Sequence, residues 1–310
     1  RLMLSMLASG RKQNYGLMYA DISRAYFYAK AVRPVYVKLP EEDLEPGDEG
    51  KCGRLKMSMY GTRDAALNWS LEYASTLLAS GYVQGKANPC LFHNAAIGVS
   101  VMVHGDDFVA VGPEDKLKDT QKTLEQKYKI KTEKLGQGDG CKSEIRILNK
   151  VIRATSEGIE LEADPRHAEL VVKELGLENA KASLVPGSKD EVKKVDKFKN
   201  IDSVQKARVS AGGDTWELET EEMPDTEEDD ELLGPEDARL YRGVAARLNY
   251  IAPDRPDIAY AVKESARGMS APKASAMRRL RKIGKYLIGS PRLVSKFVWQ
   301  DMPTKVTSFT

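Results

Sequence analysis

The chain has 310 residues, of which 41% are hydrophobic, so it has enough apolar side chains for a packed core. No run of eighteen apolar residues occurs, which excludes a predicted membrane span, and three separated cysteines without a CxxC pair argue against a disulfide framework or a zinc site. The formal net charge is only +2, but residues 214–237 contain thirteen acidic residues and no basic ones.

The remainder of the chain is strongly basic. Outside 214–237 there are 48 Lys and Arg residues against 33 Asp and Glu residues. A basic body of this kind favours a polyanionic partner and salt-dependent binding. An ordinary lysine-rich, solvated surface explains the charge equally well.

The first third of the chain mixes helix and strand signals. Residues 2–8 have a helical pattern, whereas YGLMYAD at 15–21 and PVYVKLP at 34–40 are typical of strands. Thr62 is predicted to cap a long helix that Gly81 ends, with an apolar stripe made of Leu67, Leu71, Ala74 and Leu78. Two short apolar runs, IGVSVMV and FVAVG, flank HGDD and predict buried strands joined by a tight turn.

The middle of the chain continues the mixed pattern. A helix is expected over 117–128, and EIRILNKVIRA and GIELEA predict a further pair of strands. Asp164 and Pro165 then open a helix that Gly176 closes. This order of elements predicts an α+β domain.

The last part of the chain divides into a linker and helices. Residues 187–237 lose periodicity in a lysine-rich half and then an acidic half, which predicts a disordered linker. Helices are expected over 240–251, from Asp254 and Pro256 onward, and over 272–287. The last of these helices is basic and is a candidate for nucleic-acid binding, although a solvated surface helix is the commoner explanation; its basic residues are Arg278, Arg279, Arg281, Lys282 and Lys285.

Three carboxylates carry the chemical signal. Asp106 and Asp107 sit at the tip of the predicted apolar hairpin, where two adjacent charges are costly without a cation. Asp21 ends the earlier strand, and if these strands are neighbours the three side chains can converge on a pair of Mg²⁺ ions, as in-line nucleotidyl transfer requires. The alternative is a solvated Gly-Asp-Asp turn in an unrelated protein.

The surrounding motifs resemble a known family. DISRAYF places Tyr26 five residues after Asp21, SMYGTRDAALNW at 58–69 is similar to the segment SLYGLKQAPRAW, and VHGDDFVAVG is similar to the YVDD hairpin. In this order and spacing they resemble the palm of Ty1/copia retrotransposon reverse transcriptases. Further similarity continues through GIELEADPRHAELVVKELGL to RPDIAYAV at 255–262.

The resemblance implies a fold, a division of the chain and a set of roles. The fold would be a polymerase palm with an antiparallel sheet and packed helices over 1–186, followed by the linker at 187–237 and a helical thumb or connection region over 238–310. Asp21, Asp106 and Asp107 would bind two Mg²⁺ ions, with Mn²⁺ as a substitute. Tyr26 would be the gate against a ribose 2′ hydroxyl, and the residues that hold template and nucleotide would be Tyr60, Gly61, Arg63 and Asp64.

The resemblance also implies partners and a location. An RNA or DNA template with its primer and deoxynucleoside triphosphates would be the substrates. The chain, which opens with Arg1 and stops at Thr310, would be an internal piece of a Gag-Pol polyprotein with integrase and ribonuclease H segments. The family's fingers would precede it. A virus-like particle in the cytoplasm, or the nucleus, would be its location, with no membrane partner.

Three departures from the family pattern leave an alternative open. His104 and Gly105 replace the tyrosine and the middle residue of YVDD, and Asp64 replaces a glutamine. A negative charge at Asp64 would repel a nucleotide, and about 1.4 kcal/mol of repulsion is worth roughly tenfold in rate. The alternative is therefore a catalytically inactive, degenerate or domesticated palm that still binds nucleic acid.

Overall fold

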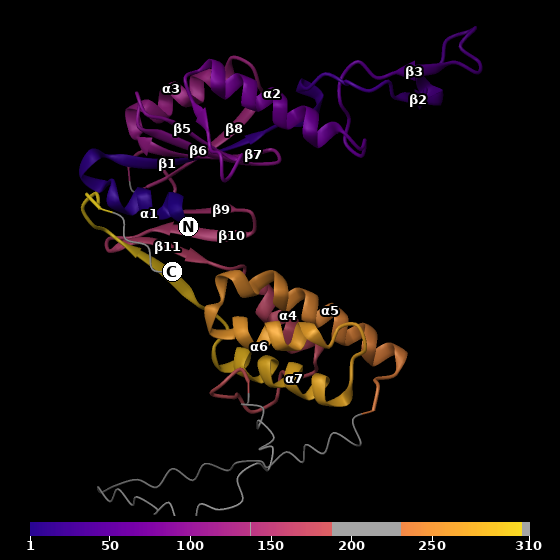
Figure 1. Cartoon of the computed structure of the whole chain (residues 1–310), viewed down its shortest axis with the longest axis vertical. Helices are drawn as coiled ribbons and strands as arrows, with labels where there is room; N and C mark the ends of the chain where they lie inside the picture. Colours follow the sequence, from indigo (N-terminus) through magenta and orange to yellow (C-terminus); the bar gives the residue numbers. More distant parts are fainter. Residues whose placement is uncertain (137, 188–230, 306–310) are drawn as a thin grey trace, which may run out of the picture. The chain divides into compact units, whose positions relative to one another are not determined.

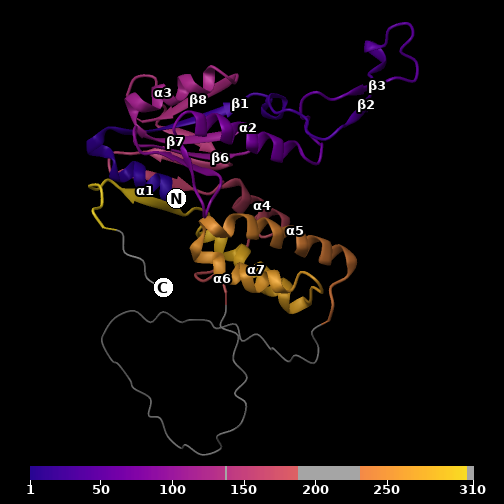
Figure 2. The ribbon, with the colours of Figure 1, turned by 45° about the horizontal axis from the view of Figure 1, so that its top comes forward.

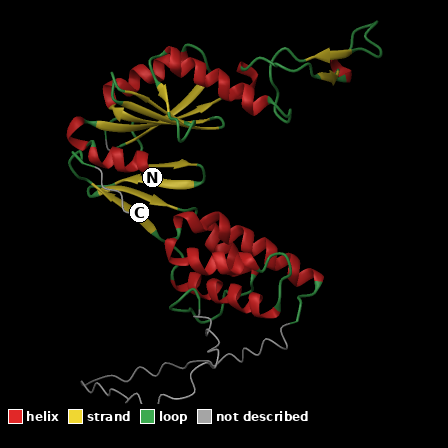
Figure 3. Ribbon diagram, viewed as in Figure 1, coloured by secondary structure: helices red, strands yellow, loops and turns green. Residues whose placement is uncertain are grey.

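The computed structural model describes residues 1–136, 138–187 and 231–305, and its helices and antiparallel sheets confirm the predicted α+β class (Figures 1 and 3). The chain forms two compact units. The first contains residues 1–162 together with the segment that starts at Val294, and the second lies within 163–293. Among the described helices, none is long and apolar enough to cross a membrane.

A six-stranded antiparallel sheet forms the centre of the first unit. Its strand order is β4-β5-β6-β7-β1-β8, so the first strand of the chain is inserted between the predicted hairpin and the strand that follows it. The strands are β1 (Tyr15–Ile22), β4 (Val83–Gln84), β5 (Leu91–Asn94), β6 (Val99–His104), β7 (Asp107–Pro113) and β8 (Ile130–Leu135). A separate hairpin consists of β2 (Tyr36–Lys38) and β3 (Cys52–Arg54).

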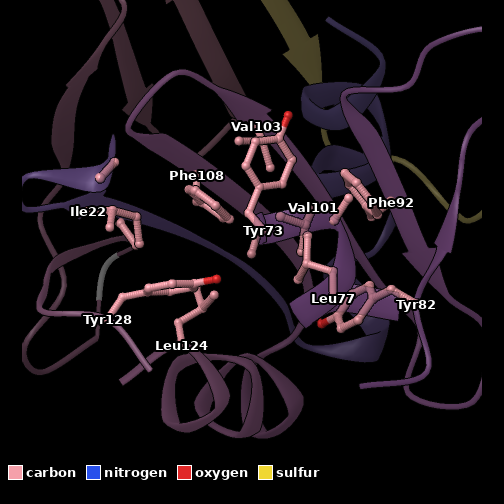
Figure 4. Close-up of a cluster of buried hydrophobic side chains, with 14 of the residues drawn as sticks. Ile22, Tyr73, Leu77, Tyr82, Phe92, Val101, Val103, Phe108, Leu124 and Tyr128 are labelled. Atoms are coloured by element: carbon pink, nitrogen blue, oxygen red, sulfur yellow. The ribbon is translucent and has the colours of Figure 1, made fainter. Parts of the chain in front are cut away.

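Two helices cover one face of this sheet. They are α2 (Ala65–Ala79) and α3 (Glu114–Glu125), and both views show them on the same side of the strands (Figures 1 and 2). The core between them and the sheet contains several aromatic side chains, among them Tyr73 and Phe108 (Figure 4). Trp69, Tyr73 and Phe108 pack edge to face or tilted. Such pairs contribute beyond the area that they bury.

The opposite face of the sheet packs on α1 (Leu2–Ser9) and on a second, four-stranded sheet. This sheet has the order β12-β11-β10-β9 and is antiparallel throughout. Its strands are β9 (Glu144–Ile147), β10 (Lys150–Ala154), β11 (Gly158–Glu162) and β12 (Val294–Val298). Residues after β12 return to α1, since Gln300 donates from its backbone to the Ala8 carbonyl at 3.2 Å.

Several local predictions were wrong. EIRILNKVIRA is two strands rather than one, because Leu148 and Asn149 take φ of 49° and 61° and form a tight turn. Thr62 does not cap α2; its hydroxyl donates to the Met59 carbonyl, and the helix begins at Ala65.

The predicted apolar stripe of α2 is mostly exposed to solvent. Leu67, Leu71 and Leu78 are 61%, 60% and 49% exposed, whereas Trp69 and Leu77 are 1% exposed. The larger aromatic side chains bury more apolar area, and the Trp69 ring nitrogen finds a partner inside.

The second unit is helical. Its helices are α4 (Arg166–Glu174), α5 (Pro235–Ile251), α6 (Pro256–Arg267) and α7 (Ala274–Gly289). They share one core in which Val171, Val244 and Leu280 are fully buried. Pro235 and Pro256 stand at helix starts, where their fixed φ and missing N–H are tolerated.

The compact units do not follow the predicted segments 1–186, 187–237 and 238–310. α4 packs with α5 and α7 through its apolar face, so the boundary falls at 162. Residues 294–298, expected in the helical region, form a strand on β11. Most of the predicted linker lies outside the described residues, but its last three residues are the first turn of α5.

The RPDIAYAV motif explains how α6 and α7 are held together. Arg255 is 2% exposed, donates to both oxygens of Asp257, and also donates to the carbonyls of Ser290 and Pro291 at the end of α7. Asp257 accepts a further bond from the Tyr286 hydroxyl. Burial opposes the ionisation of Asp257, but the hydrogen bonds and charge of Arg255 outweigh it and hold the pKa of that carboxyl below its usual value.

Asp257→Asn should therefore destabilise the helical unit by about 3 kcal/mol, because it leaves the buried Arg255 charge without a counterion. The depressed pKa means that Asp257 stabilises the fold above its unfolded pKa of about 3.9, and that this stability is lost as the pH falls through the lower, folded value. Hydrogen exchange of α6 and α7 measures the effect.

The matched control is Glu264→Gln, which breaks an ion pair with Arg267, a side chain that is 71% exposed, and should change stability by less than about 0.5 kcal/mol. Equal exchange in the two variants would refute a structural role for the Arg255–Asp257 pair.

Candidate active site on the central sheet

The strand register brings two of the three predicted carboxylates together. In the antiparallel pair of β1 and β7, Asp21 lies directly opposite Asp107. Directly opposed residues of such a pair point to the same face, with Cβ atoms about 5 Å apart. This face is the one that Leu17 and Val109 share with α1, opposite the aromatic core.

The third carboxylate, Asp106, occupies the turn between β6 and β7. His104 pairs with Asp107, which leaves Gly105 and Asp106 as a two-residue turn. Gly105 takes φ of 63°, the conformation required at the first central position of primed hairpin turns. The backbone of β1 is tied to this turn as well, since Ile22 donates to the Asp106 carbonyl at 2.9 Å.

Trp69 anchors the turn from α2. Its indole Nε1 donates to the Gly105 carbonyl at 2.9 Å, and its ring is buried in the core. The end of the SMYGTRDAALNW segment therefore supports the HGDD hairpin directly.

Tyr60 contacts both the turn and the predicted sugar gate. Its hydroxyl donates to Asp106 Oδ2 at 2.9 Å, and its ring centroid lies 4.3 Å from the ring centroid of Tyr26. Burial and the hydrogen bond to Asp106 raise the pKa of Tyr60 to about 12, so it remains a donor at neutral pH. Tyr60 is nevertheless 42% exposed.

The carboxylates influence one another electrostatically. Burial raises the pKa of Asp106, and the charges of Asp21 and Asp107 raise it further, although the hydrogen bond from Tyr60 acts in the opposite direction. Neighbouring like charges of this kind favour a cation between them.

Asp64, the residue that departs from the family pattern, has its own partners. Arg33 lies 3.4 Å from its carboxylate, and Asn68 donates to it at 3.3 Å. Limited burial opposes ionisation, but its own backbone N–H, Asn68 and Arg33 outweigh it and lower the pKa of Asp64. Its charge is thus partly compensated. Gly61 and Arg63 lie in the exposed turn before α2, with Gly61 at φ of 85°.

No three acidic, histidine or cysteine side chains within the described residues gather into a preformed metal cage. The donor chemistry still suits a hard divalent cation, because carboxylate oxygens line one sheet face around Asp21 and Asp107. Mg²⁺ commonly keeps several waters and uses one or two protein carboxylates with substrate phosphates, so it does not need a complete cage.

The basic helix α7 is partly structural. Arg281 donates to the Leu175 carbonyl near the end of α4 at 3.0 Å, and Arg278 and Arg279 have interactions as well. Helical spacing places Arg278, Lys282 and Lys285 on one side of α7. Their role in nucleic-acid binding stays a prediction.

Two residues near the carboxylates were missed from the sequence. Tyr19 donates to Asp107 Oδ1 at 2.5 Å, and burial followed by this hydrogen bond raises its pKa well above the usual value. Lys131 of β8 lies opposite Asp21 and adds a positive charge beside the three negative ones. Neither residue belongs to a motif, and only strand pairing reveals them.

Comparisons with known proteins identify the family of the chain. The profile of the family described as reverse transcriptase (RNA-dependent DNA polymerase) matches residues 1–189, more than half of the chain. The chain therefore belongs to the reverse transcriptase family.

Similar proteins include transposon polyproteins of Saccharomyces cerevisiae. The transposon Ty1-DR1 Gag-Pol polyprotein is 29% identical over 139 residues, which are 44% of this chain and 8% of that polyprotein. The truncated transposon Ty1-A Gag-Pol polyprotein is 28% identical over 139 residues and 11% of its length. The predicted Ty1/copia relationship is confirmed, and the match spans about a tenth of the relatives' length.

Trp69→Phe should loosen the carboxylate turn, because the Gly105 carbonyl loses its indole donor while an aromatic ring remains. We expect a loss of about 1–3 kcal/mol in unfolding free energy and faster hydrogen exchange over residues 103–108.

Trp299→Phe is the matched control, since its Nε1 donates to the Thr155 carbonyl at 3.1 Å in the other sheet. Its exchange over 103–108 should be unchanged. The same exchange in both variants would contradict the anchoring role of Trp69.

Proposed function

We propose that this chain carries the polymerising site of a Ty1/copia-type RNA-directed DNA polymerase, with Asp21, Asp106 and Asp107 as ligands of two Mg²⁺ ions. The observation that carries the proposal is the register of β1 and β7, which sets Asp21 opposite Asp107 beside the turn that holds Asp106. Mn²⁺ would substitute for Mg²⁺.

The chain's own residues have distinct parts in this reaction. The carboxylates would hold the cations, which would supply a lowered pKa for the primer 3′ hydroxyl and stabilisation of the negative charge on the phosphates. Tyr26, which lies in the short helix Ala25–Tyr28 and packs on the Tyr60 ring, would form the wall against the incoming sugar. Tyr60 contacts the Tyr26 ring and donates to one oxygen of Asp106, which leaves the other oxygen for a cation.

The substrates and partners follow from the same proposal. A primer on an RNA or DNA template and deoxynucleoside triphosphates would be the substrates, with α7 contacting the nucleic acid through its basic side. Integrase and ribonuclease H segments of a Gag-Pol polyprotein would be the covalent partners, and a virus-like particle in the cytoplasm, or the nucleus, the location.

Primer extension on an RNA template with Mg²⁺ tests the function. Asp107→Asn should lower the extension rate by about a thousandfold, which corresponds to about 4 kcal/mol of lost charge stabilisation. Asp139→Asn, an exposed loop carboxylate, serves as the control and should extend normally.

Binding of duplex without extension would favour the inactive, nucleic-acid-binding palm instead. That outcome requires the wild-type chain to bind with a steep salt dependence while showing no Asp107-dependent extension. The replacement of the YVDD tyrosine and its neighbour by His104 and Gly105 is the feature that suits this alternative.

The Arg33–Asp64 pair gives a second test of nucleotide binding. Arg33→Gln removes the cationic partner of Asp64 and should raise the KM for the nucleoside triphosphate by up to about tenfold, while Asp64→Gln frees Arg33 and should leave the KM unchanged or lower it. Steady-state kinetics measure both.

Lys38→Gln is the control, because Lys38 forms its exposed pair with Glu41 on the separate hairpin. If KM shifts in the same direction for Arg33→Gln and Asp64→Gln, the Arg33–Asp64 pair does not determine the local charge at the nucleotide-binding site.

A further inference from the structure

Tyr19 lies on the same face of β1 as Asp21, two residues before it. Its partner across the strand pair is Val109, and Asp107 is the diagonal neighbour on the same face of β7. Diagonal neighbours are within reach of aromatic side chains. The Tyr19 hydroxyl spans this diagonal and donates to Asp107 Oδ1 at 2.5 Å.

The surroundings of Tyr19 direct its hydroxyl to Asp107. The ring packs at the edge of the core formed with α1 and the second sheet, so it has little freedom to turn away. Glu133 of β8 lies opposite Tyr19, but its carboxylate oxygen Oε1 forms an ion pair with Lys142 Nζ at 2.6 Å.

We infer that Tyr19 is a positioning residue that fixes the Asp107 carboxylate for divalent-cation binding. The hydroxyl holds one oxygen of Asp107 and leaves the second oxygen for a cation shared with Asp21. A hydrogen bond from outside the ligand set orients a ligating carboxylate and is worth about 10- to 100-fold in metal affinity or activity. This inference rests on the proposed function, because it needs Asp107 to be a ligand.

Tyr60 differs from Tyr19 although both donate to carboxylates of the same hairpin. Tyr19 is built into the central strand of the sheet, whereas Tyr60 precedes a glycine at φ of 85° and is 42% exposed. Tyr19 therefore orients Asp107 permanently, while Tyr60 can leave Asp106 when a ligand arrives.

Binding of Mn²⁺ to the full chain, followed by electron paramagnetic resonance of the free ion, tests the inference without any polymerase activity. Tyr19→Phe keeps the packed ring and removes only the donor, and should weaken Mn²⁺ binding about tenfold. Tyr82→Phe is the matched control: it removes a buried hydroxyl bonded to Thr120 at 2.8 Å in the helix-side core and should bind Mn²⁺ like the wild type.

Asp107→Asn separates this inference from the proposed function. If the wild-type chain binds Mn²⁺ and Asp107→Asn abolishes this binding, the metal site is established. If Tyr19→Phe then binds Mn²⁺ as tightly as the wild type, only the positioning role is overturned. A wild-type chain that binds no Mn²⁺, or an Asp107→Asn chain that binds it equally well, would overturn both. An equal loss in Tyr82→Phe would also overturn the positioning role, by showing a general effect of losing a buried hydroxyl.

Kinetics supply a second readout where the chain extends primers. In Tyr19→Phe the Mg²⁺ concentration for half-maximal rate should rise about tenfold, while the rate at saturating Mg²⁺ falls less. A fall in the saturating rate with no change in the Mg²⁺ requirement would oppose the inference.

Discussion

The pairing of β1 with β7 is the constraint on which the rest of the first unit depends. A strand has a period of two, so a shift of one residue would move Asp21 into the aromatic core and Met18 to the opposite face. Burial of Met18, Ala20 and Ile22 therefore sets the side on which the carboxylate stands. Apolar burial on one face thus places charge on the other.

The hairpin between β6 and β7 is held from several elements at once. Trp69 of α2 binds the turn backbone, Tyr60 binds Asp106 from the loop before that helix, and Tyr19 binds Asp107 from β1. These contacts give the SMYGTRDAALNW segment a physical reason to accompany the carboxylates. They also show how three like charges coexist in a half-buried place, since each hydroxyl offsets part of their repulsion.

The helical unit also holds a buried charged group in place with hydrogen bonds. Arg255, paired with Asp257 at the start of α6, donates to the carbonyls just after α7, so the RPDIAYAV motif has a structural role in the fold. The chain then returns as β12 to complete the second sheet. A strand of five residues, with no alternation strong enough to stand out, was predictable only once β11 was there to pair with it.

The sequence by itself determined the α+β class, the β6–β7 hairpin, most helices and the family, because periodicity, turn residues and motif order are local properties of the chain. It also identified Asp21, Asp106, Asp107, Tyr26 and Tyr60 as candidates. Only the tertiary structure decided that Tyr19 and Lys131 flank the carboxylates, that Asp64 has a counterion in Arg33, and which side of α2 is buried. Those facts depend on strand register and on competition among apolar side chains for one core, which arise between segments distant in the chain.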